Sequence, residues 1–254
     1  MEILDLYDFI ENSSARIIKV VCSDGNQWVI RCKKQKKNSR RLFSEYVSGI
    51  LSQELGIYHP RVQIVDVPLG MFKNINSKEK LFDEKCLKSV ATLYIEGLEE
   101  FSLTSENILY FINSNQIFGY ILFIFWINLS DYYKQENIQR TPNNELVFLD
   151  FDLAFSSHAG EWGNLPDYDD LKIAINQPSF LEPFTTEIKP FEKWIDKLLD
   201  MSKTVVLKKI GLLPDCWQIP SNYMNSCIDF IFDNRSRFIQ EFKNSIGIKR
   251  NLKL

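Results

Sequence analysis

Acidic and amide side chains that suit a metal-assisted reaction lie close together in the middle of the chain. Asp131 follows an apolar run, Asn137 comes six residues later, and Asp150 and Asp152 interrupt the apolar stretch VFLDFDLAF. A carboxylate buried in such a stretch is costly unless a cation or hydrogen bonds compensate for it. Carboxylate and amide oxygens are ligands that Mg²⁺ accepts. These residue types in this order therefore suit a site in which one aspartate acts on a substrate, while an asparagine and another aspartate hold a metal ion.

A predicted β-hairpin near the start of the chain supplies positive charge. Arg16–Cys22 and Gln27–Cys32 are rich in β-forming residues and flank an Asp-Gly pair that favours a tight turn. Arg31 and Lys33 stand at the end of its second strand and point to the same strand face. Either side chain suits phosphate binding.

The segments around this hairpin complete a first half that consists mostly of strands. Residues 1–11 have a short helical pattern, and an apolar stripe from Leu42 to Leu55, closed by a glycine, predicts a helix that carries Glu45. The stretches YHPRVQIVDVP and SVATLYIEGL each predict a strand, and the second ends at Gly97.

Helical patterns dominate after Gly97, apart from a short strand predicted at Glu145–Asp150. The most apolar of these segments, Ile117–Ile127, has 11 residues and is too short to span a membrane, so a buried helix is expected. The sequence predicts helices at Thr104–Asn113, Asn115–Ile127, Glu192–Met201, Lys203–Ile210 and Ser221–Lys243.

Composition narrows the class of protein. The 254 residues carry a net charge of −3, which gives no support for a nucleic-acid partner. The five cysteines form no CxxC pair, which favours ordinary structural or surface cysteines in a reducing cytoplasm. The two histidines, His59 and His158, are expected at loop surfaces, and so small a number argues against a histidine-based metal site.

The order of these features resembles that of the HipA-like kinase family, especially its short stand-alone members. A metal-binding Asp on a strand follows a D-x-x-x-x-N pattern in protein kinases, and here WINLSDYYKQEN precedes FLDFDLAF. The stretch RLFSEYVSGILSQELGIYHP is similar to the family's N-E-x-v-a-x-x-L-a-x-x-L-G-L-P-v-P segment, and LLPDCWQ is similar to its I-P-x-x-W turn. The resemblance covers most of the chain.

This resemblance implies an α+β, two-lobed protein-kinase-like fold. Residues 1–97 would form an antiparallel sheet lobe with one helix, and 98–254 a mainly helical lobe with its catalytic segment at 126–155. ATP would lie between the lobes, Asp150 with Asn137 or Asp152 would hold Mg²⁺, and Asp131 would be the catalytic residue. The implied nucleotide-binding residues are Ser13, Ser14, Arg31, Lys33, Glu45, Tyr94, Ile95 and Glu96.

Several positions depart from the family pattern and leave alternatives open. Arg31 stands where the family has a strand lysine, and Asn137 lies one residue further from Asp131 than expected, with Glu136 in its place. Further departures are Leu129, Tyr132 and Phe151. The chain is therefore expected to phosphorylate a Ser or Thr of a protein or of itself, or to be a weak pseudokinase that binds a regulatory partner, or to phosphorylate a small molecule. Toxin–antitoxin relatives imply a growth-arresting or defence role.

Overall fold

A five-stranded antiparallel sheet forms the first part of the structure. The computed structural model describes residues 1–10, 17–33, 39–76, 82–101, 103–104, 106–131, 134–155 and 182–252. The strand order is β1-β2-β3-β5-β4. These strands are β1 (Ile3–Ile10), β2 (Ile17–Cys22), β3 (Gln27–Arg31), β4 (Val62–Asp66) and β5 (Lys88–Leu93).

The expected hairpin is present as β2 and β3. Ile18 pairs with Ile30 and Val21 with Gln27 across the ladder. Gly25 has a φ of 76° in the turn, a conformation that glycine adopts without strain.

The first residues of the chain form β1, so the prediction of a short helix there was wrong. β1 pairs antiparallel with β2, from Ile3 opposite Cys22 to Ile10 opposite Ile17, with two irregularities in the register. The pairing with β2 overrides the helical spacing, because β2 supplies hydrogen-bond partners for the backbone of this segment, which becomes the edge strand of the sheet.

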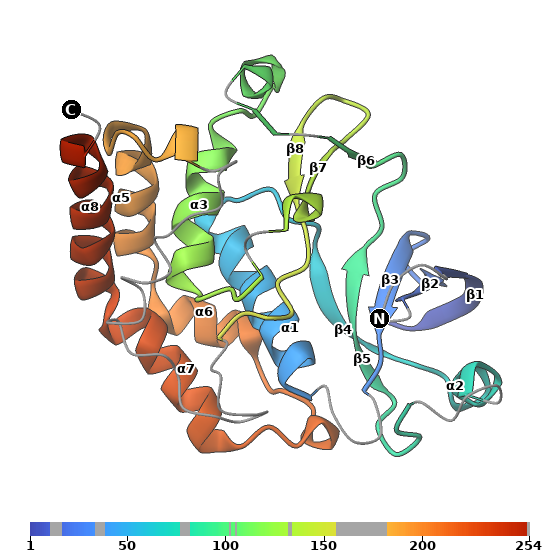
Figure 1. Ribbon diagram of the computed structural model, residues 1–254. Helices are drawn as coiled ribbons and strands as arrows, with labels where there is room; N and C mark the ends of the chain where they lie inside the picture. The colour runs from blue at the N-terminus through green and yellow to red at the C-terminus, as the bar shows by residue number, and fades with distance from the viewer. Residues whose placement is uncertain are drawn as a thin grey trace.

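One helix, α1 (Ser39–Leu55), joins the sheet to the helical part of the molecule. It packs on β4 and β5 on one side and on α5 (Glu192–Asp200) and α6 (Lys203–Ile210) on the other. In Figure 1 it runs between the sheet and the C-terminal helices. Because both sides are covered, even polar residues of α1 such as Ser44, Glu45 and Ser48 are buried.

The second part contains the long helices and a small three-stranded sheet. The helices are α3 (Gln116–Trp126), α5, α6, α7 (Ser221–Asp233) and α8 (Arg235–Leu252), and a further helix, α2 (Leu69–Asn76), follows β4. The small sheet has the order β6-β7-β8, formed by Glu99–Glu100, Ile138–Arg140 and Leu146–Phe148. Figure 1 shows α3, α5 and α8 side by side, and α5 contacts both of the others.

Two helix predictions require correction. The segment Thr104–Asn113 contains only a 3₁₀ turn, Asn107–Tyr110, because Thr104 and Asn107 cap each other and Leu109 and Tyr110 find no apolar cover. The single helix expected at Ser221–Lys243 is broken at Asn234, between α7 and α8.

Arg235 accounts for the break between α7 and α8. Its guanidinium donates to the carbonyls of Leu198 (2.8 Å) and Met201 (2.7 Å), which lie at the end of α5. These two hydrogen bonds fix the start of α8 against α5, so the chain changes direction there.

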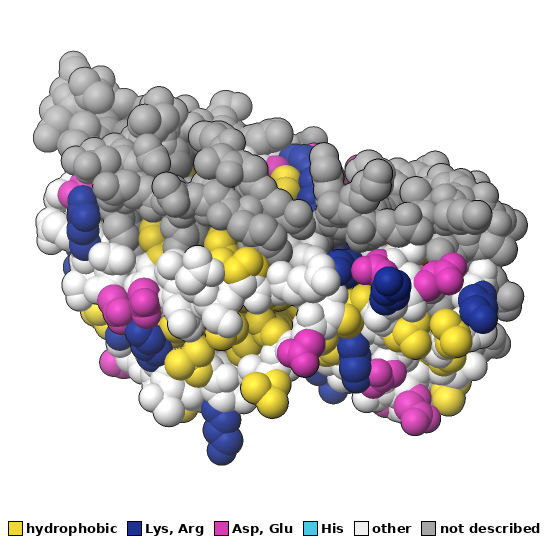
Figure 2. Space-filling model, turned by 90° about the horizontal axis from the view of Figure 1, so that it is seen from below, with side chains coloured by type: hydrophobic (Ala, Val, Ile, Leu, Met, Phe, Trp, Pro, Cys, Tyr) yellow, Lys and Arg dark blue, Asp and Glu magenta, His cyan; other side chains and the backbone are white. Residues whose placement is uncertain are grey.

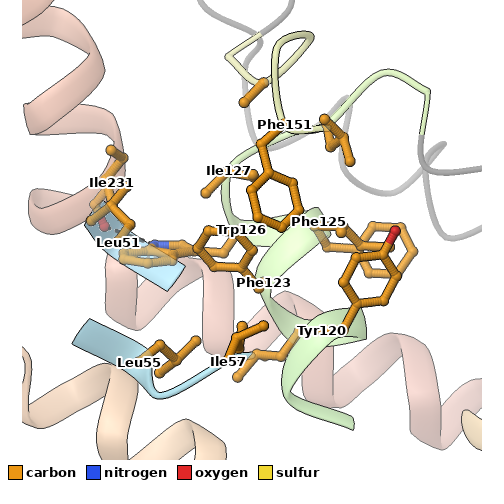
Figure 3. Close-up of a cluster of buried hydrophobic side chains, with 14 of the residues drawn as sticks. Leu51, Leu55, Ile57, Tyr120, Phe123, Phe125, Trp126, Ile127, Phe151 and Ile231 are labelled. Carbon is orange, nitrogen blue, oxygen red and sulfur yellow. Dashed lines mark hydrogen bonds between the residues drawn. The ribbon is translucent and has the colours of Figure 1, made fainter. Parts of the chain in front are cut away.

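The apolar helix predicted near Ile117–Ile127 is α3, and it lies in the centre of the main core. Its aromatic residues pack with Leu51 and Leu55 of α1, with Ile231 of α7 and with Phe151 (Figure 3). Burying a large apolar side chain contributes roughly 1.5–3 kcal/mol. The backbone that follows α3 and the turn at Phe151 are therefore held by a well-packed interior. Among the described residues, no helix has the length and apolar character needed to span a membrane.

A disulfide joins Cys86, just before β5, to Cys216, near the start of α7. This bond differs from the expectation of ordinary structural or surface cysteines, because 130 residues separate the two cysteines and no short spacing indicates the pair. The other three cysteines are free and buried.

The surface seen in Figure 2 mixes both signs of charge. Lysine and arginine side chains lie among aspartates and glutamates, with hydrophobic side chains between them. Neither sign dominates the described part of this face.

Candidate active site

Backbone hydrogen bonds bring the segment after α3 alongside the segment after β8. The N–H of Ser130 donates to the carbonyl of Leu153 (3.3 Å), and the N–H of Leu149 donates to the carbonyl of Asn137 (2.8 Å). Asp131, next to Ser130, is therefore held near the residues that follow Asp150. This pairing gathers the acidic and amide residues that the sequence singled out.

Asp150 has an unusual backbone conformation that directs its side chain. Its φ is 58°, in the left-handed region that costs a non-glycine residue roughly 1–2 kcal/mol. Strained residues of this kind concentrate at functional sites. The carboxylate Oδ1 lies 2.8 Å from Nη2 of Arg31, at the end of β3 in the five-stranded sheet.

Arg31 bridges two of the predicted metal ligands. Besides Asp150, its guanidinium donates to Asp152, whose side chain is only 4% exposed. Burial lowers the pKa of Arg31, but the carboxylates of Asp150, Glu45 and Asp152 outweigh it and raise that pKa. The guanidinium therefore remains fully charged and neutralises this acidic group.

Asp152 has a second cationic neighbour that the sequence analysis missed. Nη1 of Arg41, in the first turn of α1, lies 3.4 Å from Oδ2 of Asp152. Burial raises the pKa of Asp152, and Arg31 opposes that rise. No sequence spacing links residues 41 and 152, so only the fold identifies this pair.

Glu45 fixes the turn between the two aspartates. Its carboxylate accepts hydrogen bonds from the Phe151 N–H (2.8 Å) and the Thr92 hydroxyl (3.4 Å). Burial raises the pKa of Glu45 to about 7, and the charge of Arg31 opposes that rise. The charge of Glu45 thus raises the pKa of Arg31, and its hydrogen bond to Phe151 holds the backbone of the turn.

Lys33 points to a different part of the molecule. Its ammonium donates to the Cys216 carbonyl (2.9 Å) and the Gln218 side-chain oxygen (3.3 Å), and it lies 3.3 Å from Asp83. Of the two strand cations, Arg31 is therefore the one that lies against Asp150.

Asp131 is buried, with 2% of its surface exposed. Lys134 Nζ lies 2.8 Å from Oδ2, yet neither carboxylate oxygen has a partner in hydrogen-bond geometry among the described residues. A buried carboxylate in this condition is costly to maintain for structure alone.

Asn137 is buried as well, and its side-chain Nδ2 has no hydrogen-bond partner among the described residues. The neighbouring Glu136 is exposed and lines an open groove of about 350 Å³ with Glu100, Phe101 and Gln135. The two candidates for the counterpart of the family's asparagine, Glu136 and Asn137, thus face different surroundings.

The predicted adenine-binding segment follows β5. The Tyr94 N–H is already donated to the Gln27 carbonyl (3.0 Å), while Ile95 is half-buried and Glu96 is exposed. Gly97 has a φ of 74°, and a Cβ there would come within 2.9 Å of Pro142. The predicted phosphate-loop residues Ser13 and Ser14 lie outside the described residues, as do Tyr132 and His158.

His59 is buried beneath the site, so its expected place at a loop surface was wrong. Its Nδ1 lies 2.7 Å from the Phe148 carbonyl, and its ring lies 4.6 Å from that of Phe151. Burial lowers the pKa of His59 to about 4, so the ring is neutral. Burial of His59 could not be predicted, because a residue directly before a proline is typical of a turn or loop.

The residues present fit a magnesium ion. Asp150, Asp152 and Asn137 offer the oxygen ligands that Mg²⁺ prefers, and Mg²⁺ is usually held by one or two carboxylates together with waters and phosphates. In the part of the chain that the structure describes, no three acidic, histidine or cysteine residues form a ready-made metal cage. The Arg31 guanidinium contacts both aspartates instead.

Comparisons with known proteins identify the family and the fold. Residues 8–245 match the model of a family described as HipA-like kinase. The fold is similar to that of a Helicobacter pylori proinflammatory kinase, CtkA, with a TM-score of 0.57 and 12% sequence identity over 97% of this chain and 98% of that chain. No curated protein matches the sequence. The predicted kinase-like α+β fold is thus confirmed, and the chain belongs to the HipA-like kinase family.

Proposed function

We propose that this kinase transfers the γ-phosphate of ATP to a hydroxyl group, that of a Ser or Thr of a protein or of the chain itself. One observation carries the proposal. Asp131, Asn137 and Asp150 come from one segment folded on itself, and Arg31 of the sheet approaches Asp150 to 2.8 Å. Phosphoryl transfer needs these parts, namely an acidic residue for the acceptor, oxygen ligands for a metal and a cation for the phosphates.

Each residue has a distinct role in the proposed reaction. Asp131 accepts the proton of the acceptor hydroxyl, or orients that hydroxyl, while the acceptor oxygen forms a bond to the γ-phosphorus. The bond between the γ-phosphorus and the β–γ bridging oxygen breaks, and ADP leaves with that oxygen. Arg31 binds the phosphates, and Glu45 keeps the turn at Phe151 in place.

Asp150, with Asn137 or Asp152, would hold Mg²⁺, which supplies positive charge at the phosphate oxygens when bound. The departures from the family pattern affect this half of the site. Arg31 can contact phosphate through two parallel hydrogen bonds, which lysine cannot do. The proposed nucleotide-bound state therefore requires Arg31 to exchange at least part of its aspartate contacts for phosphate oxygens.

The proposal is tested by incubating the protein with Mg²⁺ and radiolabelled ATP, with intact mass measured in parallel. We expect a gain of one phosphate or more, or labelling of an added protein acceptor. Asp131→Asn should lower the rate about 10²- to 10⁴-fold. Asp150→Asn should also lower the rate and raise the Mg²⁺ concentration needed for half-maximal activity.

Asp229→Asn provides a matched control. Asp229 lies on α7 with 58% of its side chain exposed, and its partner is Lys203 at 3.1 Å. This variant should keep the wild-type rate. Equal rates in all three variants would refute the assignment of the site, and a screen of sugars and aminoglycosides would detect a small-molecule kinase instead.

A second candidate function is a weakly active pseudokinase that binds a regulatory partner. The observation that favours it is the double contact of Arg31 with Asp150 and Asp152, which occupies both carboxylates. Thermal shift separates the candidates. A rise in Tm with ATP and Mg²⁺ together with phosphate transfer supports the enzyme, whereas partner binding without a nucleotide response supports the pseudokinase.

A further inference from the structure

Tyr120 is a buried polar residue that the proposed reaction leaves unexplained. It belongs to α3, and its ring stacks on that of Phe148 at 4.3 Å with an angle of 10°. Its hydroxyl has no hydrogen-bond partner among the described residues, although the residue is fully buried. A buried tyrosine hydroxyl normally has a partner, because leaving it unpaired is unfavourable.

The position of the ring places this hydroxyl near the catalytic segment. Phe148 lies two residues before Asp150, and the next residue, Leu149, donates its N–H to the Asn137 carbonyl. In Figure 3 the Tyr120 hydroxyl points away from Leu55 and Ile57, to the side of the view where Phe151 lies. Burial raises the pKa of Tyr120, and the charges of Asp131 and Asp150 raise it further. The phenol therefore stays protonated and is available as a donor.

Asp131 is the acceptor that matches this donor. Its buried Oδ2 lies 2.8 Å from Lys134 Nζ, but Oδ1 has no partner among the described residues, and Asp150 already contacts Arg31. The unpaired Tyr120 hydroxyl and the unpaired Oδ1 of Asp131 thus belong to α3 and to the segment that follows it, and both contact the stretch from Phe148 to Leu153. A hydrogen bond to an ionised acceptor is stronger than one between neutral groups.

We propose that Tyr120 is a positioning residue, whose hydroxyl donates a hydrogen bond to the Asp131 carboxylate, directly or through one water molecule. This proposal rests on the function proposed above. The hydrogen bond fixes the direction of the carboxylate toward the acceptor hydroxyl. Tyr120 itself touches neither ATP nor the acceptor, so its effect is on the rate of transfer and not on nucleotide binding.

Tyr120→Phe removes the hydroxyl and keeps the ring that stacks on Phe148. We expect kcat to fall about tenfold to a hundredfold, with KM for ATP and the calorimetric Kd of Mg²⁺–ATP within twofold of wild type. The matched control is Tyr46→Phe, because the Tyr46 hydroxyl is also buried and donates to the Ile210 carbonyl at 3.2 Å. Both variants lose one buried hydroxyl, but only Tyr120→Phe should lose kcat. Unchanged kcat in Tyr120→Phe, or equal losses in the two variants, would overturn the proposal.

A second readout does not depend on activity. In protein with ¹³C-labelled tyrosine, Tyr120→Phe identifies the Tyr120 Cζ resonance by its disappearance. Asp131→Asn should shift that resonance, and Asp229→Asn should leave it in place. If Asp131→Asn leaves it unmoved, the hydrogen bond is absent and the inference fails. If the resonance shifts while the wild-type protein transfers no phosphate, the hydrogen bond stands and it is the proposed function that fails.

Discussion

Replacement of Arg31 by Met should reveal how strongly the acidic cluster depends on this one cation. The side chain of Arg31 is 14% exposed and that of Asp152 is 4% exposed. Removing one partner of a buried ion pair typically costs about 3–5 kcal/mol, because the other charge is left uncompensated. For a chain of this size the loss corresponds to a fall in Tm of about 6–20 °C.

The same substitution at an exposed pair provides the control. Arg140 is paired with Glu99, and their side chains are 43% and 59% exposed. Exposed pairs contribute about 0–1 kcal/mol, so Arg140→Met should be nearly neutral. Urea unfolding followed by tryptophan fluorescence measures both variants on one scale.

The deficit of Arg31→Met, meaning its loss of unfolding free energy relative to wild type, should depend on pH, and this provides an independent check. Without Arg31, the pKa values of Glu45 and Asp152 rise further above their unfolded values, since Arg31 is the neighbour that lowers them. A carboxyl group whose pKa is raised by folding favours the folded state more as the pH falls. The deficit relative to wild type should therefore shrink between pH 7.5 and about pH 5.5. A deficit as small as that of Arg140→Met, or one that does not change with pH, would refute the reasoning.

Two further predictions concern residues outside the catalytic segment. Because folding lowers the pKa of His59 from 6.5 to about 4, this residue contributes stability above pH 6.5 that is lost as the pH falls, by about 2 kcal/mol at pH 5. In His59→Phe, the urea midpoint should fall less between pH 6.5 and pH 5 than it does in wild type. An unchanged pH dependence of the midpoint would contradict the burial of His59. Because Cys86 and Cys216 are joined, alkylation of the denatured chain should modify three cysteines without reductant and five cysteines after reduction. Cys86→Ser should cost about 2–4 kcal/mol of unfolding free energy, whereas five modified cysteines without reductant would exclude the bond.

Local patterns in the sequence identified the elements that local interactions determine. The Asp-Gly turn of the hairpin, the apolar α3 and the helix carrying Glu45 all form within a few residues of their predicted bounds. Asp131, Asn137 and Asp150 could be placed together because their order along the chain is typical of kinases. These features depend on turn chemistry, periodicity and a known motif order.

Contacts between distant segments could not be predicted in the same way. β1 is a strand because β2 lies beside it, and His59 is buried because the turn at Phe151 covers it. Lys33 binds the Cys216 carbonyl, and Arg41 contacts Asp152, across separations of more than 100 residues. No periodicity or spacing encodes such pairs, so they appear only once the chain is folded.

A crystal structure with Mg²⁺ and a non-hydrolysable ATP analogue would test the proposed site most directly. We expect nucleotide between the five-stranded sheet and the catalytic segment, a metal ion on Asp150, and the Arg31 guanidinium on phosphate oxygens. Nucleotide bound elsewhere, or Arg31 still held by both aspartates beside a bound nucleotide, would contradict it.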